Sequence, residues 1–462
     1  MKHGSSDSPK PGNQQLQHRS GSISRPYRQV PSLSLYQLAD STWEERAVCY
    51  FFDQYTTIRD SDECVSHLSF LPSLYALCRN SDEESSASSC LRLAVDATAQ
   101  ITLGTQVKSS SLIVQGRNSY GRALRGLRRA LASREQAIKD ETFATMVLLS
   151  LFEDITGERN GLASSHTAGF EILMKLRGEG QLGNAQGRDL FSFAYAHTHI
   201  EILALRERPR YNSDWIVGRL DSSDPVHRLM LMSSKISQLF VETSSFQGPL
   251  DAGNVAKLSA LLEVSKVIDL ELAAWDRNLP DNWLPLLVSS QTGESLMTYQ
   301  RISIAAIWTY YRAVRIILQK LIIGLRATIA SLDHVADRDV VPEEPEVGVI
   351  QETITDACRS IPFAFGDIDT LGNPIPSSTE GKPRIRAFYG YIMLWPLWYI
   401  LSCGLATPAQ TEQIRSVLTG VGSALGIRLA LILAGDHGGT PNSASSGPSP
   451  YQVQSLMEGI SL

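Results

Sequence analysis

Hydrophobic residues recur at intervals of three and four along most of the chain between about residues 42 and 435. This spacing places them on one face of an α-helix, whereas a half-buried strand needs an apolar residue at every second position. Alternating runs of Val, Ile and Thr are few. The pattern therefore predicts an all-α protein, in which a single large multi-helix domain spans residues 35–435.

Two neighbouring segments show the helical pattern most clearly. In "KDETFATMVLLSLFEDITG" we expect a helix that is capped by Asp140 and ends at Gly157 in the left-handed conformation. Its apolar residues nearly encircle it, which indicates a helix surrounded by other helices. The following "SSHTAGFEILMKLRG" predicts a second helix, from a serine cap to Gly178.

Further helices are predicted by the same periodicity. The segment "GRDLFSFAYAHTHIEILALRERP" should end at Pro209, and "NVAKLSALLEVSKVIDLELAAWDRNLP" should end at Pro280. A long helix is expected from about 295 to 333 and a last one in "EQIRSVLTGVGSALGIRLALILAG". We expect an exposed connector in "DRDVVPEEPEVG" and a loop in "DTLGNPIPSSTEGKP".

The segment "NSYGRALRGLRRALAS" predicts an amphipathic helix. Its apolar face should carry Tyr120, Leu124, Leu127 and Leu131, and its basic face Arg122, Arg125 and Arg129. A basic helical face is most simply a solvated one. The alternative, a helix that reads DNA, would require a neighbouring turn-and-helix pattern, which this sequence lacks.

The stretch "FYGYIMLWPLWYILSCG", residues 388–404, carries no charged side chain. Its length is close to the roughly 17 to 25 apolar residues of a membrane span. Pro396 interrupts the backbone hydrogen bonds in its middle, however, and Gly390, Ser402 and Gly404 dilute its hydrophobicity. We therefore expect a buried helix within an all-helical core.

Composition limits the classes of function. The 462 residues are 43% hydrophobic and 19% charged, with a net charge of -6 and a pI near 5.9. Such a charge argues against a surface that holds nucleic acid or anionic lipid through bulk positive charge. Residues 1–34 lack an apolar core of the signal-peptide kind and predict a disordered tail, and residues 436–462 predict a low-complexity tail.

The six cysteines do not form a zinc-binding pattern. A structural zinc site takes thiolates in pairs about two to four residues apart, whereas Cys78 and Cys90, the closest pair, are twelve apart. Disulfides are not expected in an intracellular protein. The sequence therefore predicts no metal site and six ordinary, mostly buried thiols.

Motifs of helical enzymes are also missing from the sequence. The acidic stretches "DSDE" (60–63) and "DRD" (337–339) fall in polar, loop-like segments, and no Glu-x-x-His pair for a di-iron site occurs. His197 and His199 are two residues apart, so on a helix their rings point away from each other. His166, near a helix start, is expected to cap or pack. We predict no enzyme and nominate no catalytic, cofactor-binding or metal-binding residue.

Five tryptophans could be read in two ways. They are Trp275, Trp283, Trp308, Trp395 and Trp398. Aromatic residues at helical spacing usually belong to the core, and the alternative is that they line a cavity for a ligand.

Four segments, in this order, resemble the fungal-specific transcription factor domain, the regulatory region of fungal zinc-cluster transcription factors. They are "DETFATMVLLSLFEDITG" with "HTAGFEILMKLRG", "WDRNLPDNW" (275–283), "IWTYYRAVRIIL" (307–318), and "LWPLWYILSCG" leading into "GIRLALILAG". Each segment is short, but their common order covers most of the chain. The resemblance implies an all-α regulatory domain in which the Trp-Pro-Leu segment is a buried helix.

The DNA-binding module of that family would need six cysteines in two close-spaced triplets near the N-terminus, and this sequence departs from that pattern. Residues 1–34 are similar to the linker that follows such a cluster. The resemblance thus implies a transcription regulator of the nucleus that acts through the transcription machinery or another DNA-binding regulator, or a truncated zinc-cluster factor. A small-molecule effector is a further partner to consider. The alternative function is a helical small-molecule-binding protein or an enzyme of unassigned chemistry.

Overall fold

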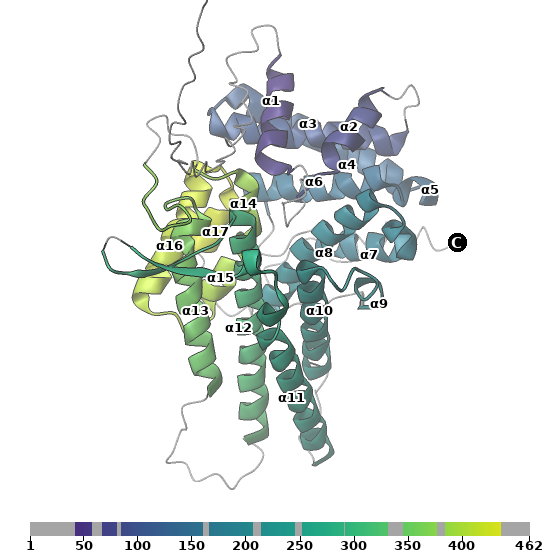
Figure 1. The fold of residues 1–462 in the computed structure, drawn as a ribbon. Helices are drawn as coiled ribbons and strands as arrows, with labels where there is room; N and C mark the ends of the chain where they lie inside the picture. The colour runs from purple at the N-terminus through teal and green to yellow at the C-terminus, as the bar shows by residue number, and fades with distance from the viewer. Residues whose placement is uncertain are drawn as a thin grey trace, which may run out of the picture. The chain divides into compact units, whose positions relative to one another are not determined.

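The computed structural model describes residues 42–57, 67–80, 85–159, 166–206, 214–244, 252–290, 292–330, 345–376 and 384–435. The two predicted tails, 1–34 and 436–462, lie outside these residues. The secondary-structure elements of the described residues are all helices except for one short hairpin, so the predicted all-α class is confirmed (Figure 1).

The first part of the fold is a group of packed helices. They are α1 (Trp43–Tyr55), α2 (Leu71–Asn80), α3 (Ser86–Gln106), α4 (Ser110–Leu131), α5 (Arg134–Ala137) and α6 (Asp140–Thr156). Helices α3 and α4 approach closely because glycines face α3. A Cβ atom on Gly126 would lie 2.8 Å from Cβ of Cys90, and one on Gly116 would lie 3.2 Å from the carbonyl oxygen of Ala97.

This close approach corrects the predicted apolar face of α4. Leu124 is 37% exposed, whereas Ala123 and Ala130 are fully buried. The small residues set the rotation of the helix, because packing against α3 requires little side-chain bulk there. The arginines at 122, 125 and 129 are exposed, as predicted for a solvated face.

Helix α6 is buried on all sides, as its sequence predicts, and it ends at Gly157 with φ +70°. The predicted cap at its start is wrong. Lys139 occupies the N-cap position without a side-chain cap, and the carboxylate of Asp140 instead pairs with the guanidinium of Arg177. Arg177 is the last residue of α7 (Thr167–Arg177), whose predicted serine cap lies outside the described residues.

The middle of the chain contains α7, η1 (Gly178–Leu182), α8 (Ala185–Leu205), α9 (Asp214–Val217), α10 (Pro225–Ser244), α11 (Ala252–Ala273), η2 (Asp276–Asn278) and η3 (Asp281–Trp283). Helix α8 ends when Arg206 adopts φ 54°, before Pro209, which is not described. Helix α11 ends at Ala273, earlier than predicted, because the chain turns into η2. Two indole N–H groups anchor this turn: Trp275 donates to the Pro225 carbonyl and Trp308 to the Trp283 carbonyl, both at 2.9 Å.

A hairpin replaces the start of the predicted 295–333 helix. Strands β1 (Leu286–Ser289) and β2 (Ser295–Thr298) pair antiparallel, with Leu286 opposite Thr298. Gly293 in the turn has φ +83°, which a glycine adopts without strain. The hydroxyl of Thr298 donates to the Thr370 carbonyl at 2.9 Å, which holds β2 against a distant loop. Helix α12 therefore begins only at Ile302.

The last part contains α12 (Ile302–Ala330), α13 (Pro345–Ala364), α14 (Ala387–Ile392), α15 (Leu394–Ser402), α16 (Pro408–Ala424) and α17 (Arg428–Gly435). Helices α10, α11, α12 and α13 lie side by side in that order (Figure 1). The predicted connector is already helical from Pro345 on. The predicted last helix is two helices, because Gly426 between them has φ +74°.

The uncharged stretch 388–404 is buried, as predicted, but it forms two short helices, α14 and α15. Pro396 is the third residue of α15. In the first turn of a helix a proline removes no intrahelical hydrogen bond, because the N–H groups there have no partner in the helix. No helix in the described part of the chain is long and apolar enough to cross a membrane.

Candidate functional site

A cluster of buried charges joins α6, α8 and α14. We call Asp154, Arg159, Glu201 and Tyr391 the charge cluster. Asp154 lies in the last turn of α6, where the helix dipole disfavours a carboxylate. The chain turns at Gly157, and the Arg159 side chain reaches back to it: Nε lies 2.6 Å from Oδ1 of Asp154, and Nη2 lies 3.2 Å from Oε2 of Glu201. These three side chains are 0 to 2% exposed, and the Arg159–Asp154 contact is ionic, without hydrogen-bond geometry.

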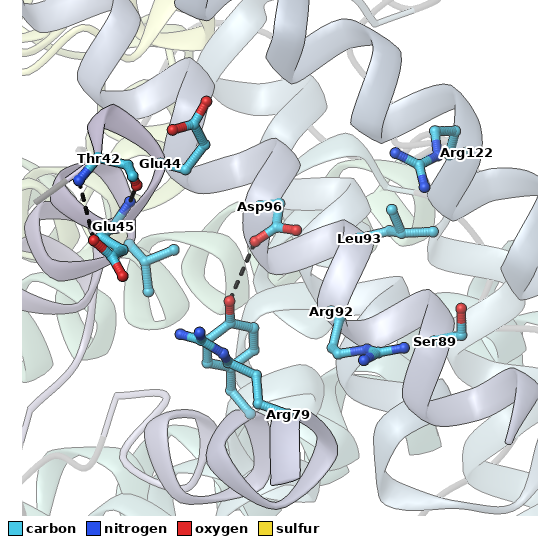
Figure 2. A pocket seen from close by; sticks show the side chains of 11 residues that line it. Thr42, Glu44, Glu45, Arg79, Ser89, Arg92, Leu93, Asp96 and Arg122 are labelled. Carbon is cyan, nitrogen blue, oxygen red and sulfur yellow. Dashed lines mark hydrogen bonds between the residues drawn. The ribbon is translucent and has the colours of Figure 1, made fainter. Parts of the chain in front are cut away.

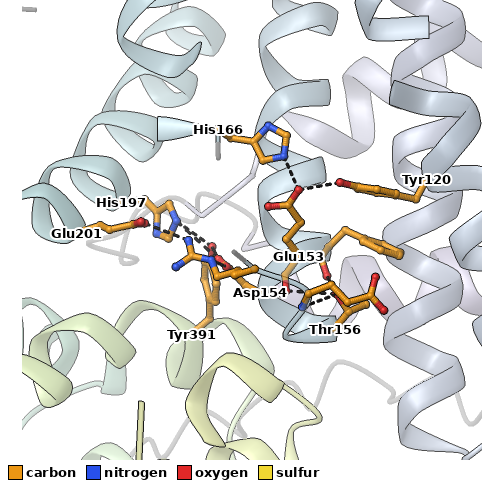
Figure 3. A network of polar contacts seen from close by, with 11 residues as sticks. Tyr120, Glu153, Asp154, Thr156, His166, His197, Glu201 and Tyr391 are labelled. Carbon is orange, nitrogen blue, oxygen red and sulfur yellow. Dashed lines mark hydrogen bonds and ion pairs between the residues drawn. The ribbon is translucent and has the colours of Figure 1, made fainter. Parts of the chain in front are cut away.

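Tyr391 connects the cluster to a histidine (Figure 3). Its hydroxyl donates to Oδ2 of Asp154 at 2.7 Å and lies 3.0 Å from Nε2 of His197. The single phenolic proton is used toward the carboxylate, so His197 must donate its Nε2–H to the Tyr391 oxygen. The described residues provide no hydrogen bond to the other ring nitrogen, Nδ1.

Burial dominates the protonation states here. It lowers the pKa of His197 to about 3, with the Arg159 charge acting in the same direction, so the ring is neutral and Nδ1 is an acceptor. Burial alone would lower the pKa of Arg159, but the carboxylates of Asp154 and Glu201 more than offset this and raise it. Burial raises the pKa of Asp154, while the Arg159 charge and the Tyr391 hydroxyl oppose that shift. We take Asp154 as ionised because a guanidinium in direct contact stabilises the carboxylate.

The carboxylate of the neighbouring Glu153 contacts two further polar side chains. Tyr120 of α4 donates its hydroxyl to Oε1 at 2.7 Å, and Nε2 of His166 lies 2.9 Å from the same oxygen (Figure 3). His166 stands at the N-cap position of α7 but makes no side-chain cap. Of the two roles expected for this residue, the structure therefore shows packing against another helix.

His197 and His199 point to different partners, as their spacing predicts. His199 donates Nε2–H to the Ser233 carbonyl of α10 at 3.0 Å. Within the described residues no group of three or more His, Cys, Asp and Glu side chains is arranged to hold a metal ion. Cys64 and the acidic stretches at 60–63 and 337–339 lie outside them.

A mainly apolar pocket of about 160 Å³ adjoins the charge cluster. Helices α8, α10, α12, α14 and α15 supply its walls, and His197 and Tyr391 belong to both features. All five tryptophans considered in the sequence are buried, as the core interpretation predicts. Only Trp395 among them lines this pocket.

A second hollow, of about 530 Å³, lies among α1 to α4 (Figure 2). Its charged lining residues are Glu44, Glu45, Arg79, Arg92, Asp96 and Arg122. Tyr75 donates its hydroxyl to Asp96 at 3.2 Å. Burial raises the pKa of Tyr75 to about 12, and Asp96 adds to this shift. We call this feature the polar hollow.

The charge cluster has a structural role, because it joins α6, α8 and α14. The guanidinium of Arg159 contacts both carboxylates, so each buried charge has an opposite charge beside it. Sequence reasoning nominated none of its members, although a signal was present: the apolar helix ends in two adjacent carboxylates, and an arginine follows within "FEDITGER". Glu201 and Tyr391 had no such local signal, because they come from other helices.

The comparisons with known proteins identify the family. The model of the fungal specific transcription factor domain matches residues 80–328, which is more than half of the chain. An uncharacterised protein of Emericella nidulans is 38% identical over 94 residues, which is 20% of each chain. Transcription factor dbaG of the same organism is 24% identical over 360 residues, 74% of this chain and 80% of dbaG. No solved structure matches.

The family match runs from the end of α2 to the last turn of α12 and contains three members of the charge cluster. Three of the four segments that carry the sequence resemblance lie within it, and the fourth, around Trp395, lies beyond it. The resemblance is thereby confirmed, and this chain belongs to the fungal specific transcription factor domain family.

Proposed function

We propose that this protein is a non-enzymatic regulator of transcription in the nucleus, and that its helical body acts by binding protein partners. The observation that carries the proposal is the family match over residues 80–328. The similarity to dbaG, named as a transcription factor, supports it over a longer stretch. The internally paired charge cluster also supports it, since the charged groups of that cluster serve one another.

The proposed route to DNA is indirect. A net charge of -6 gives this chain no bulk attraction for a polyanion. We propose that another DNA-binding regulator, or the transcription machinery, places it at a promoter. A zinc cluster encoded upstream of Met1 is the alternative, and the genomic sequence there decides between them: two close-spaced cysteine triplets would make this chain part of a zinc-cluster factor.

A reporter assay tests the proposed function. The full chain is fused to an unrelated DNA-binding module and measured on a reporter of intermediate basal activity, so that both activation and repression are visible. We expect a change in transcription relative to the module alone. The matched control is the same fusion with Asp154→Ala, which should lose the effect because the charge cluster is broken. An unchanged reporter, with the fusion present in the nucleus at normal level, would contradict the proposal.

A second candidate function, binding of a small molecule, is favoured by one observation, the pocket beside the charge cluster. It is compatible with regulation, because a ligand there would contact residues that hold three helices together.

A further inference from the structure

Several aromatic side chains line the pocket between α8, α10, α12, α14 and α15. His197 stacks on Phe193 with ring centroids 6.1 Å apart and on Tyr391 with centroids 5.1 Å apart, at interplanar angles of 4° and 24°. Trp395, Tyr310, His67 and His227 are further aromatic residues of the lining. Flat aromatic walls favour a flat aromatic guest.

The volume of the pocket sets the size of that guest. An engineered apolar cavity of about 150 Å³ stays dry and binds benzene, and this pocket has about 160 Å³. A single ring with one or two small substituents therefore fits, whereas a fused polycyclic compound does not fit without movement of a wall.

The electrostatics select a neutral guest. No lysine or arginine is found among the described residues that line the pocket, so an anion would find no counter-charge. The two carboxylates at the pocket are already engaged. Asp189 accepts from the hydroxyl of Ser69 at 3.3 Å, and Asp224 accepts from the backbone N–H of Val226 at 2.7 Å at the start of α10.

Other polar groups of the lining are also engaged with protein partners. The hydroxyl of Tyr310 lies 2.8 Å from that of Ser233, and the hydroxyl of Ser192 lies 3.4 Å from Nε2 of His227.

Two further ring nitrogens of the lining, Nε2 of His67 and Nδ1 of His227, have no hydrogen-bond partner among the described residues, but both atoms are buried from solvent. Nδ1 of His197 differs from both, because its side chain keeps some exposed surface. This nitrogen is an unprotonated acceptor, because Nε2 donates to Tyr391, and the described residues offer it no donor. The His197 side chain keeps 12% of its surface exposed in spite of its enclosed position, so it is open to a guest.

We propose that this pocket binds a small, neutral, single-ring phenol, whose hydroxyl donates a hydrogen bond to Nδ1 of His197 while its ring lies against Phe193 and Trp395. A phenol combines the apolar ring that the walls favour with the one donor that the acceptor requires.

His197 would connect the bound ligand to the charge cluster through hydrogen bonds. The same imidazole that would accept from the phenol donates to Tyr391, and Tyr391 donates to Asp154. A bound phenol therefore polarises a chain of hydrogen bonds that ends at the joint of α6, α8 and α14. Its role as an effector rests on the proposed regulatory function, but its binding does not.

Three probes of the same shape test the pocket: p-cresol, toluene and p-toluate. Binding to the purified full chain is measured by isothermal titration calorimetry at pH 7. We expect one saturable site for p-cresol, about fivefold weaker binding of toluene, which lacks one neutral hydrogen bond, and no binding of the p-toluate anion. The binding assay involves no DNA and no transcription, so its failure is distinguishable from failure of the reporter assay.

Variants locate the site. Ala306→Leu places a larger side chain in the pocket and should abolish binding of both neutral probes. Ala327→Leu, the same change at an exposed position of the same helix, should leave binding unchanged. His197→Phe should remove the advantage of p-cresol over toluene, because the ring remains and the acceptor is lost. Melting curves establish that each variant is folded.

Several outcomes would overturn the proposal: no saturable binding of p-cresol to the unmodified chain, equal binding of p-cresol and toluene, or undiminished binding in Ala306→Leu. If Ala306→Leu does not fold, Ala196→Leu on the α8 wall replaces it. The comparison of the three probes on the unmodified chain needs no variant and decides the question by itself.

Discussion

The polar hollow and the apolar pocket differ in a way that their sizes do not suggest. The polar hollow is the larger, about 530 Å³ against about 160 Å³. Its lining carries three carboxylates and three guanidinium groups, all on the helices nearest the N-terminus. A ligand there would have to compete with water for charged groups that are exposed or half-buried. The apolar pocket offers burial of apolar surface and, at Nδ1 of His197, an accessible acceptor without a donor, so chemistry and not volume makes it the better binding site.

The two regions also differ in their expected importance for stability. The ionic side chains of the charge cluster are almost fully buried, whereas the charged side chains of the polar hollow are half-buried or exposed. Removing one partner of a buried ion pair leaves an uncompensated charge, but removing a hydrated charge leaves little behind. Substitutions in the two regions therefore measure this difference directly.

The largest effect is expected for Asp154→Ala. It removes the nearer of the two carboxylates that face Arg159, at 2.6 Å, and leaves the buried hydroxyl of Tyr391 without its acceptor. We expect a loss of about 3 to 5 kcal/mol in the free energy of unfolding, measured by urea denaturation. The matched change in the polar hollow, Asp96→Ala, removes one hydrogen bond from Tyr75 and should cost about 1 kcal/mol. Equal losses of unfolding free energy for the two variants would show that the charge cluster is no more important for stability than the polar hollow.

Adjacent alanines on α12 should respond differently to enlargement. Ala305 is fully buried and lines neither cavity, so Ala305→Leu should overpack the core and cost about 1 to 3 kcal/mol. Ala306 faces the apolar pocket, and Ala306→Leu can extend into space, with a change in stability below about 1 kcal/mol. Melting temperatures of the two variants provide the check. A larger loss for Ala306→Leu would mean that the pocket is too small to accept a side chain.

Acid should lower the free energy of unfolding through His67, which lines the apolar pocket. Burial lowers the pKa of His67 to about 4, below its ordinary value of 6.5, although the hydrogen bond of its Nδ1 to the Tyr55 carbonyl opposes this shift. The unfolded chain therefore binds the proton first, so the stability contributed by the neutral ring is present above pH 6.5 and is lost as the pH falls toward 4.

For His67 alone this amounts to about 1.5 kcal/mol between pH 6.5 and pH 5. Chemical denaturation at the two pH values, with His67→Phe as control, should show a shallower dependence in the variant. The lining of the polar hollow contains no histidine among its described residues. Substitutions in the polar hollow should therefore leave the dependence of the unfolding free energy on pH unaltered between pH 6.5 and pH 5. The same slope in His67→Phe and in the unmodified chain would show that this ring is not kept neutral by folding.

The smallest effect is expected for Arg122→Ala at the rim of the polar hollow. The side chain lies on the exposed face of α4, where substitutions usually change stability by no more than about 0.5 kcal/mol. Thermal unfolding at low and high salt gives the measurement. A loss comparable to that of Asp154→Ala would show that the polar hollow holds the fold together as the charge cluster does.

The sequence pattern was sufficient to predict an element where that element depends only on residues close to it in the chain. The apolar surround of α6 and its end at Gly157 were predictable because both depend on neighbouring residues. The start of α12 was not, since the β1–β2 hairpin is stabilised by the contact from Thr298 to Thr370, 72 residues away. Leu124 was misassigned for a related reason: the glycines that face α3 rotate α4 more strongly than its leucines do.

The candidate site shows the same limit more sharply. Tyr391 and Asp154 are separated by 237 residues, and the sequence between them gives no sign that they share a proton. The spacing of His197 and His199 argues against a shared metal ion, but it says nothing about the use of His197 as a hydrogen-bond acceptor. The role of a single polar group in a core depends on which other helices surround it, and spacing along one helix does not report that.

The amino-acid sequence by itself determined that this protein is helical, that the 388–404 stretch is buried and that the chain resembles one family of regulators, because helical periodicity and short ordered motifs are properties of the chain. The tertiary structure alone decided which carboxylates Arg159 contacts, which ring nitrogen of His197 remains open, and that a pocket lies beside them. Those features depend on distances between side chains of separate helices, and such distances exist only after the helices have packed.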